Sequence, residues 1–352
     1  MEQILSETSQ VRPAHRFDLE NLKEYMNSHV EEFTGELEIR QFTHGQSNPT
    51  FILDDGHRKY VLRKKPPGKL LPSAHQVERE YRIISALYDT DVPVPQTYAL
   101  CTDDGVIGTA FYIMELVEGR IFRDARASQA SGSKERAAIF DAMNDTLARI
   151  HKVDWQALGL ADYGKPGNYM GRQVARWSKQ YQASETDEIK SMDALMEWLP
   201  RHLPEDTSPT IVHGDYRLEN LIIHPTEPRV VAVLDWEIST LGHPLADLAY
   251  TCMNYRIPSM EGEAIGLAGL DLEALGIPSE EAFVETYCRR TGREIPEDWP
   301  FFIAFSLFRL AAIAQGVYKR GLDGIASSET ALAVGAYVKV LADIAWHQVL
   351  GR

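Results

Sequence analysis

The sequence predicts an α+β protein with a small β-rich amino-terminal lobe and a larger, mainly helical carboxyl-terminal lobe. Two observations support this fold class. Residues 37–117 alternate short apolar runs with turn residues, whereas helical periodicity dominates after residue 118. A length of 352 residues suits one large domain or two lobes. We therefore divide the chain into lobes 1–117 and 118–352.

The amino-terminal lobe is expected to hold an antiparallel sheet and one main helix. A short amphipathic helix over 18–30, with Asp18 as its N-cap, precedes the sheet. The main helix is expected over 75–88, because its apolar residues recur on one face. Asp54-Asp55-Gly56 is typical of a hairpin turn. The strands are expected at 37–42, 50–53, 59–63, 97–101 and 110–116.

The carboxyl-terminal lobe is expected to be helical around a compact β insertion. Its helices are expected at 134–151, 169–183, 192–199, 244–253, 279–291, 300–320 and 327–350. The insertion comprises strands at 210–213, 221–224 and 230–234. These strands deliver polar residues at their ends, which is where we look for chemistry.

The composition excludes some classes of partner. A formal net charge of −15 argues against nucleic acid, whose phosphates need basic surfaces. The first 18 residues lack the apolar stretch of a signal peptide. The longest apolar stretch, 301–318, is interrupted by Ser306, Arg309 and Gln315, which favours a buried helix over a membrane span. The three cysteines are widely spaced. We therefore expect a cytoplasmic protein without a membrane partner; the oligomeric state is not predicted.

Three polar side chains carry the strongest chemical signal. Asp215 follows one predicted strand, Asn220 precedes the next, and Asp235 ends the third. Phosphoryl transfer needs positioning and charge neutralisation more than covalent catalysis. Magnesium takes oxygen ligands of the kind that Asn and Asp supply, and a separate carboxylate can accept the proton of an acceptor hydroxyl. The set predicts an ATP- and Mg²⁺-dependent kinase for a small-molecule alcohol.

The pattern His213-Gly214-Asp215, followed five residues later by Asn220, resembles the HxDxxxxN catalytic loop of protein kinases. Together with Leu234-Asp235-Trp236, it resembles the aminoglycoside phosphotransferase family, and choline and homoserine kinases have similar loops. The resemblance covers roughly residues 35–320 and implies a bilobal protein-kinase-like fold.

The same resemblance implies roles for the matching residues. Asp215 would be the catalytic base, and Asn220 and Asp235 would bind magnesium. His213 would brace the loop without taking part in the chemistry. Asp247 matches a family residue thought to brace the same loop.

The strand 59–63 matches the kinase strand that contacts the nucleotide phosphates. Alternation places Val61 against adenine and Arg63 toward phosphate, where the kinase pattern has Lys. Lys64 is the neighbouring basic residue and should point the other way. Glu80 matches the helix residue that pairs with this cation, with Glu78 as the alternative.

Two further segments match the kinase nucleotide site less closely. Residues 43–48 occupy the place of the Gly-rich loop but contain a single Gly, so Ser47 and backbone N–H groups would contact phosphate. Residues 111–117 resemble the hinge, where main-chain groups of Glu115 and Val117 would contact adenine.

The acceptor site is expected in the helical lobe. Arg309 lies inside an apolar helix, where it could bind the acceptor or pair with an internal carboxylate. Trp236 and Glu237 follow the metal-binding Asp and could also face the acceptor. His151 is expected to be a core histidine.

Two alternatives to an active kinase were considered. A catalytically silent nucleotide-binding module is disfavoured by the joint presence of Asp215, Asn220 and Asp235. A two-metal phosphohydrolase would need a second ligand cluster, which the sequence does not offer. Residues 60–80 resemble the kinase-like domains fused to acyl-CoA dehydrogenases, which suggests a hydroxyacyl-CoA acceptor over an aminoglycoside-like one.

Overall fold

The computed structural model describes residues 7–43, 48–66, 76–259, 266–325 and 330–351. Its chain forms two compact units. Unit 1 comprises residues up to 120 together with 221–238, and unit 2 comprises 121–220 and the residues from 239 onward. Unit 1 is built on an antiparallel sheet and unit 2 is mainly helical, which confirms the predicted fold class.

The division into units differs in one respect from the expected single boundary after residue 117. The hairpin of β8 (Leu221–Ile223) and β9 (Val230–Val233), expected as an insertion in the helical part, groups with unit 1. An antiparallel bridge joins Arg120 to Ile223, and the Val233 N–H donates to the Pro93 carbonyl at 2.9 Å. These main-chain bonds tie the hairpin to the segments that flank the sheet.

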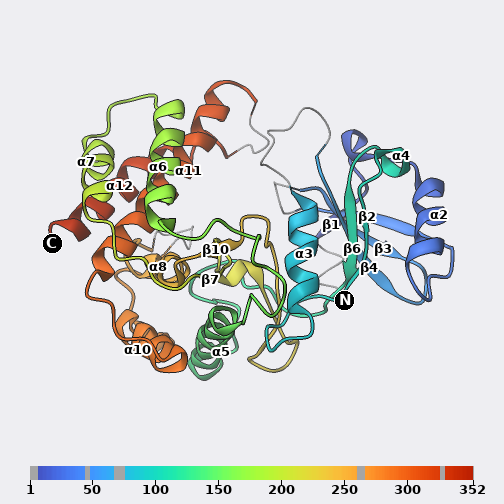
Figure 1. Cartoon of the computed structure of the whole chain (residues 1–352), viewed down its shortest axis with the longest axis horizontal. Coiled ribbons are helices and arrows are strands. Elements are labelled where there is room, and N and C mark those ends of the chain that lie inside the picture. Colours follow the sequence, from blue (N-terminus) through green and yellow to red (C-terminus); the bar gives the residue numbers. More distant parts are fainter. Residues whose placement is uncertain (1–6, 44–47, 67–75, 260–265, 326–329, 352) are drawn as a thin grey trace. The chain divides into compact units, whose positions relative to one another are not determined.

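The sheet of unit 1 has six strands in the order β1-β2-β3-β4-β6-β5 (Figure 1). Every neighbouring pair is antiparallel. The four strands that match the prediction closely are β2 (Glu38–Phe42), β3 (Thr50–Asp54), β4 (Lys59–Lys64) and β5 (Thr97–Cys101). The fifth predicted strand, expected at 110–116, is β6 (Phe111–Glu115). The short β1 (Thr8–Ser9) was not predicted.

Alternating side chains give the sheet two different faces. Phe51, Leu62 and Ile113 belong to a fully apolar core with α2 (Leu19–His29). The intervening residues of β4 and β6, such as Arg63 and Tyr112, contact residues of α3 (Val77–Leu87) on the other face. Figure 1 shows α3 beside the sheet. One face of the sheet therefore packs into the apolar core, and the other face can carry charged side chains.

Local signals explain the ends of these elements. Asp18 caps α2 by accepting from the N–H groups of Glu20 and Asn21, as predicted. The β3–β4 turn contains Gly56 at φ +85°, the left-handed conformation that glycine adopts without strain. Between β5 and β6 the chain forms the one-turn helix α4 (Asp104–Ile107), with Asp103 as its N-cap.

Unit 2 is a set of helices around one short antiparallel strand pair, β7 (Thr210–Val212) and β10 (Thr240–Gly242). The pair includes β10, which the sequence did not predict. The helices are α5 (Ser133–Lys152), α6 (Tyr169–Ser184), α7 (Lys190–Trp198), α8 (Pro244–Cys252), α9 (Leu272–Leu275), α10 (Glu280–Thr291), α11 (Trp299–Leu322) and α12 (Gly335–Val349). Helix α12 begins later than the expected residue 327, and residues 326–329 lie outside the described part of the chain.

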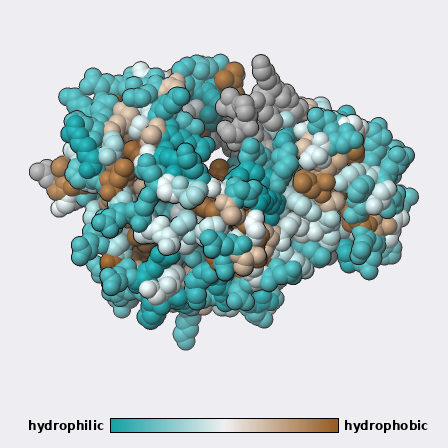
Figure 2. Space-filling model, in the orientation of Figure 1, coloured by the Kyte–Doolittle hydropathy of each residue, from teal (hydrophilic) through white to brown (hydrophobic). Residues whose placement is uncertain are grey.

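Helix α11 is the apolar helix that the sequence singled out. By length and composition alone it could cross a membrane, but 72% of its most apolar window is buried inside the protein. Its neighbours within unit 2 are α6, α8 and α12. The predicted burial of this helix is confirmed. Figure 2 shows that hydrophilic residues dominate the face of the protein in view.

Candidate active site

The loop that follows β7 is held by a buried carboxylate. Asp247, on α8, accepts hydrogen bonds from the main-chain N–H groups of His213, at 2.6 Å, and Gly214, at 2.7 Å. Gly214 has φ +88°, a left-handed conformation that a side chain would strain. Asp247 is 1% exposed, so these bonds are shielded from water. The carboxylate therefore sets the backbone conformation immediately before Asp215.

Asp247 is itself held in place by His151. The His151 Nε2 lies 3.3 Å from the Asp247 carboxylate, and its Nδ1 lies 2.6 Å from the Tyr287 hydroxyl. Burial lowers the pKa of His151, which keeps the ring neutral. Burial opposes ionisation of Asp247, but hydrogen bonds from His151 and the loop N–H groups hold its pKa below the usual value. A neutral His151 that donates from Nε2 therefore accepts from Tyr287 at Nδ1.

Asp215 is partly exposed and is surrounded by donors. The Asn220 amide nitrogen donates both to the Asp215 carboxylate, at 2.9 Å, and to its main-chain carbonyl, at 2.8 Å. Arg217 Nε lies 3.3 Å from the other carboxylate oxygen, and the side chain of Asp215 is 20% exposed. Burial raises the pKa of Tyr250, and the nearby Asp215 charge raises it further. This carboxylate is oriented and accessible, as a hydroxyl-orienting base requires.

The geometry of Asn220 fits the predicted metal role. Both described bonds of its side chain use the amide nitrogen, so the nitrogen is committed to Asp215. The amide oxygen is the hard donor that remains for Mg²⁺. Among the described residues, no group of three or more His, Cys, Asp or Glu side chains is placed to hold a metal ion. Such a cluster is not required where nucleotide phosphates complete the magnesium shell.

Arg309 lies against the same loop. Its Nη2 donates to the Gly214 carbonyl at 2.7 Å, and its guanidinium lies 4.7 Å from the centre of the Tyr250 ring. No carboxylate pairs with Arg309 within the described residues, so the internal ion pair considered from the sequence is not formed. The partners of this buried guanidinium are a carbonyl and aromatic rings.

In unit 1, Arg63 joins two carboxylates. Its guanidinium lies 3.1 Å from Glu80 and 3.0 Å from Asp235. Glu78 pairs with Lys65 instead, which decides between the two predicted partners in favour of Glu80. Lys64 lies on the opposite face of the sheet, over the Phe17 ring, as alternation predicted.

The Arg63 cluster is buried and strongly charged. Glu80 is 0% exposed, and burial raises its pKa to about 7 against the opposing effect of Arg63. The charges of Asp235 and Glu237 raise the pKa further. Arg63 keeps its charge, because these carboxylates hold its pKa well above the usual value despite burial. The cluster carries more negative than positive charge, which favours an added cation.

Asp235 has an unusual backbone conformation for a residue with a side chain. It follows β9 with φ +67°, one of four such non-glycine residues in the described chain. Residues held in this region are typically kept there by surrounding structure and concentrate at functional sites. Its side chain is 32% exposed, so the carboxylate is accessible as well as bound to Arg63.

The two residues after Asp235 have structural contacts. Trp236 is 0% exposed, and its indole N–H donates to the Val233 carbonyl at 2.9 Å. This burial contradicts the predicted contact of Trp236 with an acceptor. Glu237 accepts from the Asn48 side chain at 3.1 Å, also within unit 1.

The residues predicted to contact adenine lie in β4, at the end of β6 and just after it. Val61 is 5% exposed on the α3 face of the sheet. The Glu115 N–H donates to the Gln96 carbonyl at 2.8 Å, so an adenine contact from Glu115 would have to use its carbonyl. Glu115 also lines a polar cavity of about 460 Å³. Val117 lies in the segment after β6, and Ser47 is outside the described residues.

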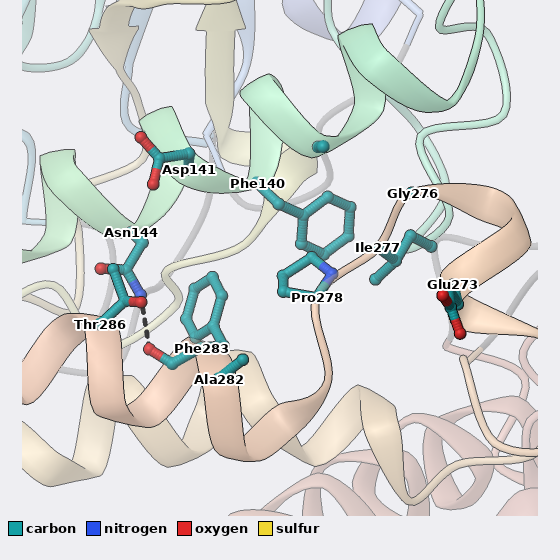
Figure 3. A pocket seen from close by; sticks show the side chains of 11 residues that line it. Phe140, Asp141, Asn144, Glu273, Gly276, Ile277, Pro278, Ala282, Phe283 and Thr286 are labelled. Carbon is teal, nitrogen blue, oxygen red and sulfur yellow. Dashed lines mark hydrogen bonds between the residues drawn. The ribbon is translucent and has the colours of Figure 1, made fainter.

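A separate cavity of about 320 Å³ lies in unit 2 between α5 and α10 (Figure 3). Phe140 and Phe283 face into it, and the Asn144 amide donates to the Phe283 carbonyl at 2.8 Å (Figure 3). Its lining contains none of the site residues predicted from the sequence. The geometry gives this cavity no part in phosphoryl transfer.

Sequence reasoning missed Tyr250 and Trp177. Tyr250 lies three residues after Asp247 on α8, so helical spacing could have placed it near the loop. Trp177, on α6, comes near Arg309 only through tertiary packing. His151 was expected to be a satisfied core histidine, which its two hydrogen bonds confirm.

Comparison with known proteins places the chain among phosphotransferases. Residues 38–299 match the model of the phosphotransferase enzyme family. The chain is 50% identical to mouse acyl-CoA dehydrogenase family member 10 over 313 residues and 45% identical to human family member 11 over 348 residues. These matches cover 89% and 96% of the chain but only 29% and 44% of the relatives, so the chain spans less than half of their length.

Solved structures share the fold. A Ralstonia eutropha protein crystallised as a candidate aminoglycoside phosphotransferase is 52% identical, with a TM-score of 0.86 over 96% of this chain and 99% of that one. Choline kinase from Cryptosporidium parvum has a TM-score of 0.65 at 13% identity, covering 95% and 96% of the two chains. Aminoglycoside phosphotransferase APH(4)-Ia, in complex with ADP and hygromycin B, has a TM-score of 0.61 at 16% identity, covering 95% and 99%. The last two show the fold alone.

Proposed function

The chain belongs to the phosphotransferase enzyme family, and from this premise we propose that it transfers the γ-phosphoryl group of ATP to a hydroxyl of a small molecule. The observation that carries the proposal is the state of Asp215. This carboxylate is accessible, is oriented by Asn220, and is anchored through the loop that Asp247 holds. A buried or freely rotating carboxylate would not serve as a hydroxyl-orienting base.

Each residue has a defined task in this proposal. Asp215 accepts a hydrogen bond from the acceptor hydroxyl, orients it in line with the phosphoryl group, and takes its proton as the new P–O bond forms and the bond to ADP breaks. Asn220 keeps that carboxylate in one rotamer through its amide N–H groups. Arg63, held by Glu80, supplies positive charge to the nucleotide phosphates.

Magnesium would be held by the Asn220 amide oxygen and the Asp235 carboxylate. When bound, Mg²⁺ neutralises the charge of the phosphates and of the leaving group. The donor chemistry fits, because both residues present hard oxygens and the Asn220 nitrogen is already used. Asp235 would then exchange part of its contact with Arg63 for the cation.

We propose a hydroxyacyl-CoA-type metabolite as the acceptor and the cytoplasm as the location. The relatives named acyl-CoA dehydrogenase family members 10 and 11, at 45–50% identity, support this acceptor class over an aminoglycoside. At 52% identity, the Ralstonia protein described as a candidate aminoglycoside phosphotransferase supports the competing class.

The test uses purified protein with Mg²⁺-ATP and a panel of 4-hydroxyacyl-CoAs, aminoglycosides, choline and homoserine. Formation of a phosphorylated product is followed by mass spectrometry and by ADP release, with Asp215→Asn as the inactive control. Turnover of a 4-hydroxyacyl-CoA supports the proposal, and turnover confined to aminoglycosides removes the acyl-CoA assignment. ATP binding without turnover across the panel would favour a silent nucleotide-binding module.

A further inference from the structure

A series of alternating guanidinium and aromatic groups leads from the surface of α6 to Asp215. The Arg176 guanidinium lies 5.7 Å from the centre of the Trp177 ring, and the Arg309 guanidinium lies 5.3 Å from the same ring. Arg309 also lies 4.7 Å from the centre of the Tyr250 ring, and its Nη2 donates to the main-chain carbonyl immediately before Asp215 at 2.7 Å. All five residues belong to unit 2.

As far as the structure describes the chain, no carboxylate forms an ion pair with Arg176 or Arg309. Arg172, one turn before Arg176 on α6, donates only to the carbonyls of Gly167 and Lys165. Three guanidinium groups without a carboxylate pair among the described residues therefore lie in one region of a chain whose 51 acidic residues outnumber its 36 basic ones.

Arg309 shows that part of this positive charge lies in the core. The residue is 8% exposed, and its Nε is a buried donor without a hydrogen-bond partner. A buried charge normally has a counter-ion, because burial without one is costly. Here aromatic faces and one carbonyl stabilise the guanidinium instead.

The electrostatic surroundings of Tyr169, at the start of α6, include the same guanidinium groups. Burial raises the pKa of Tyr169 to about 12; the charges of Arg309, Arg176 and Arg172 act to lower it, and that of Asp247 acts to raise it. Three guanidinium groups and one carboxylate therefore lie in the neighbourhood of this hydroxyl.

We propose that Arg176, Arg172 and Trp177 form a recognition site for an anionic group of the acceptor, a phosphate or a carboxylate. This inference rests on the proposed phosphotransferase function and specifies the charge of its substrate. Arg176 is the exposed member that contacts the anion, and Trp177 supplies a flat apolar surface beside it. The positive charge of Arg309 adds to the attraction for the anion, while its Nη2 hydrogen-bonds to the Gly214 carbonyl.

The site disfavours cationic acceptors. Polyamine-bearing compounds such as aminoglycosides would place like charges near Arg172 and Arg176 without a carboxylate to offset them. A hydroxyl compound that carries phosphate gains a charge-assisted hydrogen bond in the same place. The chain therefore has the fold of aminoglycoside phosphotransferases with an acceptor site of opposite charge preference.

The experiment compares two matched pairs of acceptors. One pair is the 4-hydroxyacyl thioester of pantetheine and the same thioester of 4′-phosphopantetheine, which lacks adenine and so avoids the ATP site. The other pair is 4-hydroxybutyrate and its amide. In one pair or in both, kcat/KM should be about tenfold higher for the anionic member. This is the factor expected for one charge-assisted hydrogen bond.

Variants assign the preference to the site. Arg176→Gln should lower kcat/KM for the preferred anionic acceptor about tenfold and leave that for its neutral partner unchanged, and Arg176→Lys should restore part of the loss. Arg201→Gln is the matched control, because it removes the same charge from an exposed position of unit 2 that pairs with Glu197. The KM for ATP should be unaffected in all three variants.

A binding measurement keeps the inference testable if no acceptor is turned over. The affinity for 4′-phosphopantetheine is measured by calorimetry with Mg²⁺-ADP saturating, at low and at high salt. Arg176→Gln should weaken it about tenfold, and added salt should weaken it in the wild type more than in the variant. Equal affinities of wild type and Arg176→Gln, together with no anionic preference in either acceptor pair, would overturn the inference while leaving the proposed function open to its own test.

Discussion

Replacing Asp247 by Asn tests whether a buried carboxylate holds the catalytic loop. Asp247 is 1% exposed and accepts three hydrogen bonds: from His213 at 2.6 Å, from Gly214 at 2.7 Å and from His151 at 3.3 Å. One carboxylate oxygen serves both histidine donors, and the other serves Gly214. Asn has only one oxygen, so its NH₂ group would face one of these donors.

The expected loss follows from this arrangement. If the amide oxygen keeps both histidine bonds, the Gly214 N–H loses a bond to a charged acceptor and stays buried without a partner. The lost bond and the desolvated donor each cost about 1–3 kcal/mol. We therefore expect Asp247→Asn to lower the free energy of unfolding by about 3 kcal/mol.

Urea denaturation measures this loss, and steady-state kinetics measures its consequence for transfer. Asp141→Asn is the control, because Asp141 is 63% exposed and its pair with Arg290 should contribute less than about 1 kcal/mol. Because the loop carries Asp215, kcat should fall more than the affinity for ATP. If Asp247→Asn unfolds within 0.5 kcal/mol of the wild type, roughly the scatter of surface substitutions, the clamp does not hold the loop as described.

Four further predictions concern the charged residues and the metal. Asp215→Asn should lower kcat about 10²–10⁴-fold, the range for loss of a general base, while calorimetry finds ATP binding unchanged; near-normal turnover would refute the role of Asp215. Asp235→Asn should weaken ATP binding in the presence of Mg²⁺ but much less in EDTA, and equal losses in both would remove the metal assignment. Wild-type turnover should vanish in EDTA and return with added Mg²⁺. In the folded protein the pKa of Glu80 is about 7, higher than in the unfolded chain. Protonated Glu80 therefore stabilises the fold at low pH, and this contribution disappears as pH rises through 7. Urea denaturation between pH 5.5 and 8 should show this decline in the wild type and its absence in Glu80→Gln; the same slope in both would refute it.

The sequence predicted most of the fold because the patterns that carry it are local. Alternation in β4 placed Arg63 and Lys64 on opposite faces, and the ion pair with Glu80 and the position of Lys64 over Phe17 confirm that placement. The capping role of Asp18 depends on N–H groups two and three residues away. Short-range geometry of this kind requires no knowledge of distant segments.

The sequence by itself also determined which residue types are available for chemistry: Asp215 and Asn220 in one loop, and Asp235 after the next hairpin. Tertiary structure decided what surrounds them. Trp236 became a core residue, β10 paired with β7, and Trp177 and Arg309 met across two helices. These outcomes depend on contacts between residues dozens of positions apart. Packing and burial determine the free energy of such contacts, and the local periodicity of the sequence does not indicate which distant residue a side chain will contact.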